Sequence, residues 1–128
     1  MTWTSRAPVL AEALQRALAQ GVTAGAYVYA NAVKRGLAGG YTSGAWVTGN
    51  VMNSVTVVPA VPSPTDIVAY VGTNVLYALF WEVGHQNLFT RRHEQVEVWR
   101  PTLLAEAGAI QARIQEVTMA AVQAMGPA

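Results

Sequence analysis

Residues 70–85 constrain the fold most, because they combine many apolar and aromatic side chains with a single acid, Glu82. The start of this stretch belongs to a predicted strand over residues 66–71, and its second part reads as a short helix over residues 75–83 that ends at Gly84. So much apolar surface in a short span has to be buried, either in the chain's own core or against a neighbouring molecule.

The composition favours a subunit over an isolated molecule. The 128 residues predict a single domain, 1–128, that is large enough for a core. Only 12% of the residues are charged and 52% are hydrophobic, whereas about a quarter of an ordinary domain is charged. A monomer this apolar would be poorly soluble, so we expect much of its surface to be buried against other subunits.

Charge and cysteine content exclude several classes of protein. The net charge of +1 gives no general nucleic-acid footprint, and the absence of cysteine excludes a disulfide scaffold and thiol chemistry. The N-terminus lacks the pattern of a signal peptide, and no apolar run reaches the roughly 18 residues of a membrane span. We therefore expect synthesis in the cytoplasm and no membrane partner.

A long helix is predicted over residues 4–36. Gly21 and Gly25 interrupt its pattern, so either the helix kinks or breaks there, or another backbone packs close. Gly36 and Gly39-Gly40 are expected to end it. The apolar stripe of this helix consists of Leu10, Leu14, Leu18, Val22, Tyr29 and Val33.

Extended structure is predicted over residues 45–58, with a short helical turn over residues 49–53 as the alternative within it. Three prolines between positions 59 and 64 end the strand, because proline cannot donate to a ladder. If the proline-rich segment is a hairpin loop, residues 55–58 and 67–71 pair antiparallel.

The most polar segment, residues 86–97, is predicted to be a surface loop or an extended β-arm. Pro101 then opens the last helix, predicted over residues 102–125. Its apolar stripe consists of Leu103, Leu104, Ala107, Ile110, Ile114, Val117, Ala121 and Met125, with Glu106, Gln111, Arg113 and Glu116 facing outward.

These elements predict an α+β fold. Long N-terminal and C-terminal helices pack on a small antiparallel sheet, with a short helix and the polar loop or β-arm between the sheet and the last helix. The expected segments are the first helix (1–36), the sheet, short helix and arm (45–99), and the C-terminal helix (101–125).

Catalytic chemistry has few candidate residues. Glu82, His85, His93 and Glu94 are the only candidates for a metal or acid–base site. The Glu82-x-x-His85 spacing resembles one arm of a carboxylate–imidazole metal site, but the second arm is missing and Gly84 ends the helix first. Catalytic and phosphate-binding motifs are also missing. We predict no enzymatic activity, no metal and no cofactor.

Three short segments occur in order along the chain: residues 48–55 (TGNVMNSV), 77–85 (YALFWEVGH) and 99–104 (WRPTLL). With the long helix before them, they resemble the neck and tail-completion proteins of HK97-like long-tailed bacteriophages, the family of head–tail connectors and tail components. Val83 and Thr102 stand where the family has aromatic residues, and His85 stands where it has threonine.

The resemblance implies a virion structural protein at the head–tail junction, without catalysis. Its copies would form a ring, expected to be a hexamer, beside a portal-adaptor or connector ring and the tail-tube protein. Double-stranded DNA would pass through the lumen without base-specific contacts. A neck connector and a tail terminator both fit. The alternatives outside this class are a homo-oligomeric interaction module unrelated to phage and a small metal-dependent hydrolase.

We expect particular roles for single residues. Gly49 and Gly84 would supply backbone conformations that a side chain opposes. Glu82 would pair with Arg100, because an unpaired buried carboxylate is unfavourable. An arm over residues 86–98 would reach a neighbouring subunit or ring, or line the lumen. The other structural or interface candidates are Tyr77, Ala78, Phe80, Trp81 and Pro101, and the candidates for the arm, the lumen or DNA proximity are Arg91, Arg92 and His93.

Two of these groups have competing interpretations. The aromatic residues at positions 77, 80 and 81 could stack on bases, but helical spacing favours a core or subunit contact. The basic residues at 91–93 could contact phosphates, but a solvated loop neutralised by Glu94 and Glu97 is favoured.

Overall fold

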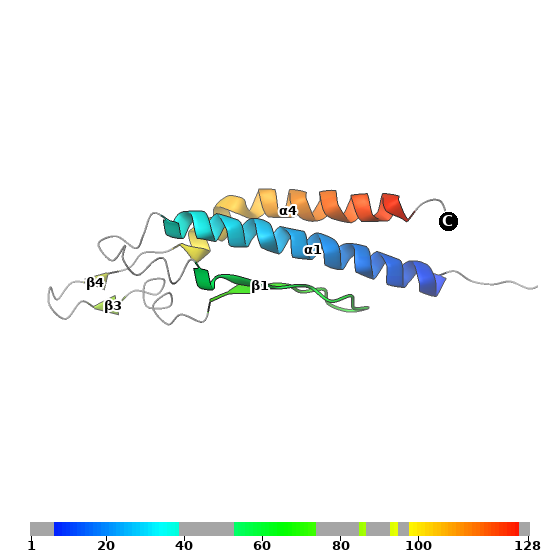
Figure 1. Cartoon of the computed structure of the whole chain (residues 1–128), viewed down its shortest axis with the longest axis horizontal. Helices are drawn as coiled ribbons and strands as arrows, with labels where there is room; N and C mark the ends of the chain where they lie inside the picture. The colour runs from blue at the N-terminus through cyan, green and yellow to red at the C-terminus, as the bar shows by residue number, and fades with distance from the viewer. Residues whose placement is uncertain (1–6, 39–52, 74–84, 87–92, 95–97, 126–128) are drawn as a thin grey trace, which may run out of the picture. The chain divides into compact units, whose positions relative to one another are not determined.

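The structure, a computed structural model, describes residues 7–38, 53–73, 85–86, 93–94 and 98–125 (Figure 1). Two long helices pack on a small two-stranded antiparallel sheet, β1–β2, so the predicted α+β fold is confirmed. No helix in the described ranges combines the length and hydropathy of a membrane span. In chain order the elements are α1 (Ala7–Ala38), β1 (Thr56–Val58), β2 (Tyr70–Gly72), β3 (His85–Gln86), β4 (His93–Glu94) and α4 (Trp99–Ala124).

The chain divides into two compact units. Unit 1 holds Met1–Val28, Val57–Tyr70 and Ala109–Ala128, and unit 2 holds Tyr29–Thr56 and Val71–Gly108. Each unit therefore contains one part of α1 and one part of α4.

In unit 1 the two helices touch through the glycines of α1. A Cβ atom on Gly21 would lie 2.7 Å from the carbonyl oxygen of Ile114 and would overlap Thr118 Oγ1. A Cβ atom on Gly25 would lie 2.6 Å from Ile114 Cγ1 and 3.3 Å from Ile110 Cγ2. Because later residues of α1 meet earlier residues of α4, the helices are antiparallel. α1 runs unbroken past both glycines, so the expected close approach of another backbone is the correct alternative.

Three leucines of the predicted α1 stripe are only partly covered. Leu10, Leu14 and Leu18 follow the same side of α1 as Gly21, but they are 39%, 45% and 42% exposed. Figure 1 shows the reason, since α4 separates from α1 toward the N-terminal end of α1. The buried apolar residues of the described chain are Ala17, Ala19, Ala30, Ala32, Val33, Leu37, Val55 and Val98.

α4 begins at Trp99, before the predicted start, and Pro101 lies in its first turn as expected. The predicted apolar stripe is wrong in part, because Leu103 and Leu104 are exposed whereas Glu106 is half-buried. In unit 1, Ile110, Ile114 and Thr118 of α4 face Gly21 and Gly25 of α1. The half-buried residues of α4 are Trp99, Thr102, Glu106, Ile110, Ile114, Val117, Thr118, Ala121 and Val122, and none is fully buried.

The proline-rich segment connects β1 to β2, as predicted for a hairpin. β2 starts at Tyr70, later than the predicted strand over residues 67–71. Between the strands, the turn is held by side-chain hydrogen bonds, because Thr65 N donates to Ser63 Oγ at 3.2 Å. Asn53 is helical, in agreement with the alternative helical turn; residues 49–52 lie outside the described ranges.

The polar segment contains a pair of short strands, which favours the β-arm over a plain loop. β3 and β4 pair antiparallel, with His85 opposite Glu94 and Gln86 opposite His93. Val98, the last residue of the predicted arm range of 86–98, is buried.

α1 passes Gly36 and ends at Ala38, directly before Gly39 in the sequence, so of the glycines expected to end it the later pair agrees with the observed end. In unit 2 a Cβ atom on Gly36 would lie 3.0 Å from Val98 Cγ1, so this glycine lets the residue before α4 approach α1. Val98 also accepts a hydrogen bond at its carbonyl oxygen from Thr102 N at 3.1 Å, which begins the α4 ladder. Packing against Val98 therefore explains why a glycine, and not a larger residue, occupies position 36.

Candidate functional site

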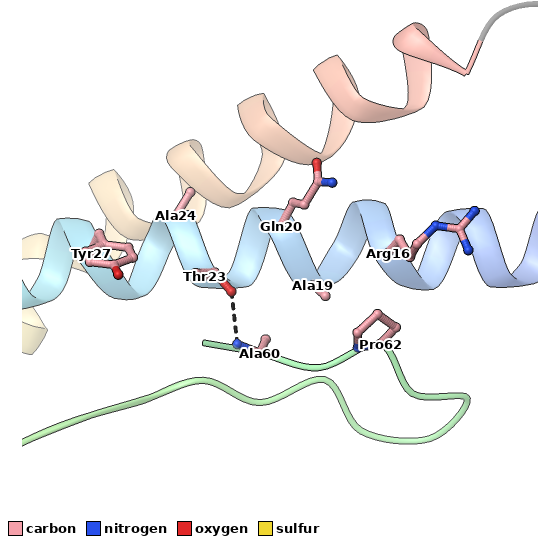
Figure 2. A pocket seen from close by; sticks show the side chains of 8 residues that line it. All are labelled: Arg16, Ala19, Gln20, Thr23, Ala24, Tyr27, Ala60 and Pro62. Atoms are coloured by element: carbon pink, nitrogen blue, oxygen red, sulfur yellow. Dashed lines mark hydrogen bonds between the residues drawn. The ribbon is translucent and has the colours of Figure 1, made fainter. Parts of the chain in front are cut away.

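A groove runs along α1 in unit 1. Its volume is about 440 Å³, and Figure 2 shows Arg16 toward one end and Tyr27 toward the other. Eleven residues separate these two positions, which corresponds to about 16 Å of helix. The groove is lined by Arg16, Ala19, Gln20, Thr23, Ala24 and Tyr27 of α1 and by Ala60 and Pro62 of the hairpin segment.

One hydrogen bond holds the hairpin side of this groove. Ala60 N donates to Thr23 Oγ1 at 3.0 Å (Figure 2). Thr23 lies almost opposite Gly21 on α1, because two residues advance the helix by about 200°. In unit 1, α1 is therefore the middle layer, with α4 on its glycine side and the hairpin on its Thr23 side (Figure 2).

The hairpin exposes apolar side chains on its outer side. In the segment that leads into β2, Ile67 and Ala69 are half-buried, whereas Val68 and Tyr70 are exposed. We define the outer hairpin face as Val58, Val61, Val68 and Tyr70, which are 55%, 71%, 47% and 65% exposed. Antiparallel sheets with one solvated face normally carry polar residues there, so this face is unusual for a surface in water.

Charges are sparse on these surfaces of unit 1. Arg113 and Glu116 of α4 form an exposed ion pair at 2.8 Å, which contributes little stability. Among the described residues, Arg16 of the groove and Asp66 of the hairpin have no ion-pair partner. Asp66 is also the only charged residue between Arg35 and Glu82.

The start of α4 is anchored in unit 2. Tyr29 Oη donates to the Trp99 carbonyl oxygen at 2.6 Å, and the two rings meet edge to face with centroids 6.2 Å apart. This contact fixes the chain direction just before Arg100 and Pro101, two of the predicted interface residues. Both are exposed at the start of α4.

The candidate metal residues are brought together only in part. The β3–β4 ladder places His85 opposite Glu94, and His93 is opposite Gln86. Over the described ranges, no group of three histidine or acidic residues could hold a metal ion. Glu82, the remaining candidate, lies outside those ranges.

Most of the other predicted site residues also lie outside the described ranges. Their predicted roles, including the Glu82–Arg100 pair, stay predictions. These residues are Gly49, Tyr77, Ala78, Phe80, Trp81, Gly84, Arg91 and Arg92.

The groove and the outer hairpin face were not predicted from the sequence. The signal for the hairpin face was present, because Val58, Val61, Val68 and Tyr70 lie in a segment whose only charge is Asp66. The signal for the groove was absent, because it depends on which side of α1 the hairpin covers.

Comparisons with protein-family models, with curated proteins and with solved structures give no match.

Proposed function

We propose that this protein is a bacteriophage virion structural protein whose copies form a ring at the head–tail junction, with six as the expected number. The ring would contact a portal-adaptor or connector ring and the tail-tube protein, as a neck connector or a tail terminator. Double-stranded DNA would pass through it.

The observation that carries this proposal is the inverted distribution of apolar residues. Half of the eight buried apolar residues in the described chain are alanines. Large apolar side chains, by contrast, are exposed on α1, on the hairpin and on α4, including Leu104 at 71%. Scattered exposed leucines are ordinary, but buried residues this small beside so many large exposed ones, in the ranges that the structure describes, are typical of a subunit that buries its flanks in an assembly.

Two further observations support the phage assignment in particular. The segments at 48–55, 77–85 and 99–104 follow the order of the family pattern. The long first helix, the small sheet and the closing helix also match the expected layout. A net charge of +1 suits a channel that DNA slides through, because many lysine or arginine contacts to phosphate would hold the DNA.

Assembly of the purified chain tests the proposal. Native mass spectrometry is expected to detect a closed oligomer, and negative-stain images are expected to show a ring with a hole wide enough for duplex DNA. A chain that stays monomeric at every concentration, or that forms only dimers, would contradict the ring. Addition of the protein to tailless and headless phage particles would then separate a joining role from an unrelated oligomer.

Shortening the β-arm is expected to impair joining and to leave folding intact. Residues 87–92 would be replaced by Asn-Gly, because a two-residue turn can connect Gln86 to its partner His93. The melting temperature should change by less than about 2 °C, since Val98 and the α4 start remain. Activity in head–tail joining should fall at least tenfold. Loss of the fold in this variant would show that the arm is structural instead.

A further inference from the structure

The outer hairpin face calls for an apolar partner. Its inner side packs on α1 through the Thr23–Ala60 hydrogen bond, so the hairpin is already seated on its own chain. The hairpin segment still exposes Val58, Val61, Val68 and Tyr70. An exposed hairpin with apolar residues on its outer face is an aggregation hazard unless something covers it.

The groove on α1 has the complementary properties. Its walls are mainly alanine, proline and the ring of Tyr27, which is 50% exposed. Arg16 lies toward one end of it without an ion-pair partner in the described chain, and the hairpin carries one unpaired anion, Asp66. One surface therefore offers apolar walls and a cation, and the other offers apolar side chains and an anion.

We propose that the outer hairpin face of one copy docks in the α1 groove of the next copy, with Asp66 of one copy near Arg16 of the other. This inference rests on the proposed ring. The two surfaces differ, so the contact is heterologous, and each copy keeps one free groove and one free hairpin for further neighbours. Repetition of such a contact closes a ring when the rotation between copies permits it.

The size of the two surfaces fits the core of such an interface. A standard interface buries about 800 Å² on each partner, and its centre is apolar with few charges. A groove of about 440 Å³ accepts a few side chains of the size of valine and tyrosine. A rim from other parts of both copies would complete the contact.

Charge decides between a second copy and other occupants. A nucleic acid would require a cluster of basic residues, and Arg16 is the only cation lining the groove. The groove and the hairpin together carry one charge of each sign, so two copies neutralise each other. A second copy is therefore the occupant that these residues favour.

Cross-linking between two different variants tests the contact, and the absence of cysteine makes the background low. Tyr27→Cys and Val68→Cys would be made in separate chains with different tags, mixed, assembled and treated with a short bismaleimide. Most of the product should join the two variants. Tyr27→Cys alone should give at least fivefold less, because a heterologous contact does not bring two grooves together. The matched control, Tyr27→Cys mixed with Met119→Cys on the exposed side of α4, should also give at least fivefold less.

The outcomes separate this contact from the ring itself. Rings that form with equal cross-linking in the control overturn the docking contact and leave the ring in place. Wild-type chains that never assemble overturn the proposed function and the contact with it. Preferential joining of Tyr27→Cys to Val68→Cys supports the contact.

Charge reversal provides a second measurement. Arg16→Glu and Asp66→Arg should each raise the midpoint concentration of assembly about tenfold, and the double variant should return it to within about threefold of wild type. Glu12→Lys, which also changes a charge on α1, is the control and should leave the midpoint unchanged. Single variants that assemble like wild type, or a double variant that fails to recover, would overturn the Arg16–Asp66 pairing.

Discussion

Replacing Gly21 by valine is expected to lower the free energy of unfolding by about 3 kcal/mol or more, a large part of the stability of a small domain. Its Cβ would lie 2.7 Å from the carbonyl oxygen of Ile114, and this backbone atom moves only if α4 moves. Thr118 Oγ1, buried against the same glycine and without a hydrogen-bond partner in the described chain, leaves no room on the other side. Urea unfolding followed by circular dichroism at one protein concentration measures the change.

Alanine substitutions provide the matched controls. Gly21→Ala should lose about 1–2 kcal/mol, because overpacking outweighs the helix propensity gained. Gly108→Ala gains the same propensity with no atom within 4 Å of the new Cβ, so it should stabilise by up to about 1 kcal/mol. If Gly21→Ala and Gly108→Ala stabilise equally, the close helix contact is wrong.

A pair of double variants locates the clash. At Gly25 the new Cβ would meet Cγ1 and Cδ1 of the Ile114 side chain. Ile114→Ala should therefore relieve Gly25→Ala and should not relieve Gly21→Ala, because every residue at position 114 keeps the carbonyl oxygen.

Leu37→Ala is expected to lower the free energy of unfolding by about 3 kcal/mol, and the same substitution at Leu104 by less than about 0.5 kcal/mol. Leu37 is 0% exposed and, with Val33, is one of the two largest fully buried side chains in the described ranges. Truncation of a fully buried leucine removes apolar contacts and leaves a cavity, and both effects are unfavourable. Leu104 is the same residue type at 71% exposure.

Thermal melting of both variants checks this expectation. A change of 3 kcal/mol corresponds to roughly 10 °C for a domain of this size. Equal shifts for the two leucines would contradict the assignment of the core to Leu37. Because Leu104→Ala could weaken assembly without affecting the fold, both variants should be measured at a concentration where the chain is monomeric.

The helices were predictable because their signals are local. Apolar periodicity and Pro101 in a first turn marked α1 and α4 to within a few residues. The inward side of α4 was predicted in part, because Ile110 and Ile114 of the predicted stripe meet Gly25 and Gly21 of α1. Thr118 also faces Gly21 and was not predicted, since contact with a glycine requires a short distance between the helices and not an apolar side chain. Leu103 and Leu104 were expected inside and are exposed.

The hairpin and the groove beside it were predictable from the sequence only in part. The prolines predicted where β1 ends, but β2 starts at Tyr70, later than its apolar pattern predicted. The outer hairpin face could have been found from its lack of charge. The groove could not, because it needs the position of Ala60 against Thr23, which is a contact between distant parts of the chain.

The pairing of α1 with α4 also determines the order in which the chain can fold. Gly21 and Gly25 near one end of the chain meet Ile110, Ile114 and Thr118 near the other, so these contacts have a very large sequence separation. During synthesis from the N-terminus, α1 leaves the ribosome long before its partner exists. Its glycine side therefore stays uncovered until residues 110–118 have been made, so the contact between α1 and α4 in unit 1 forms late relative to α1 itself.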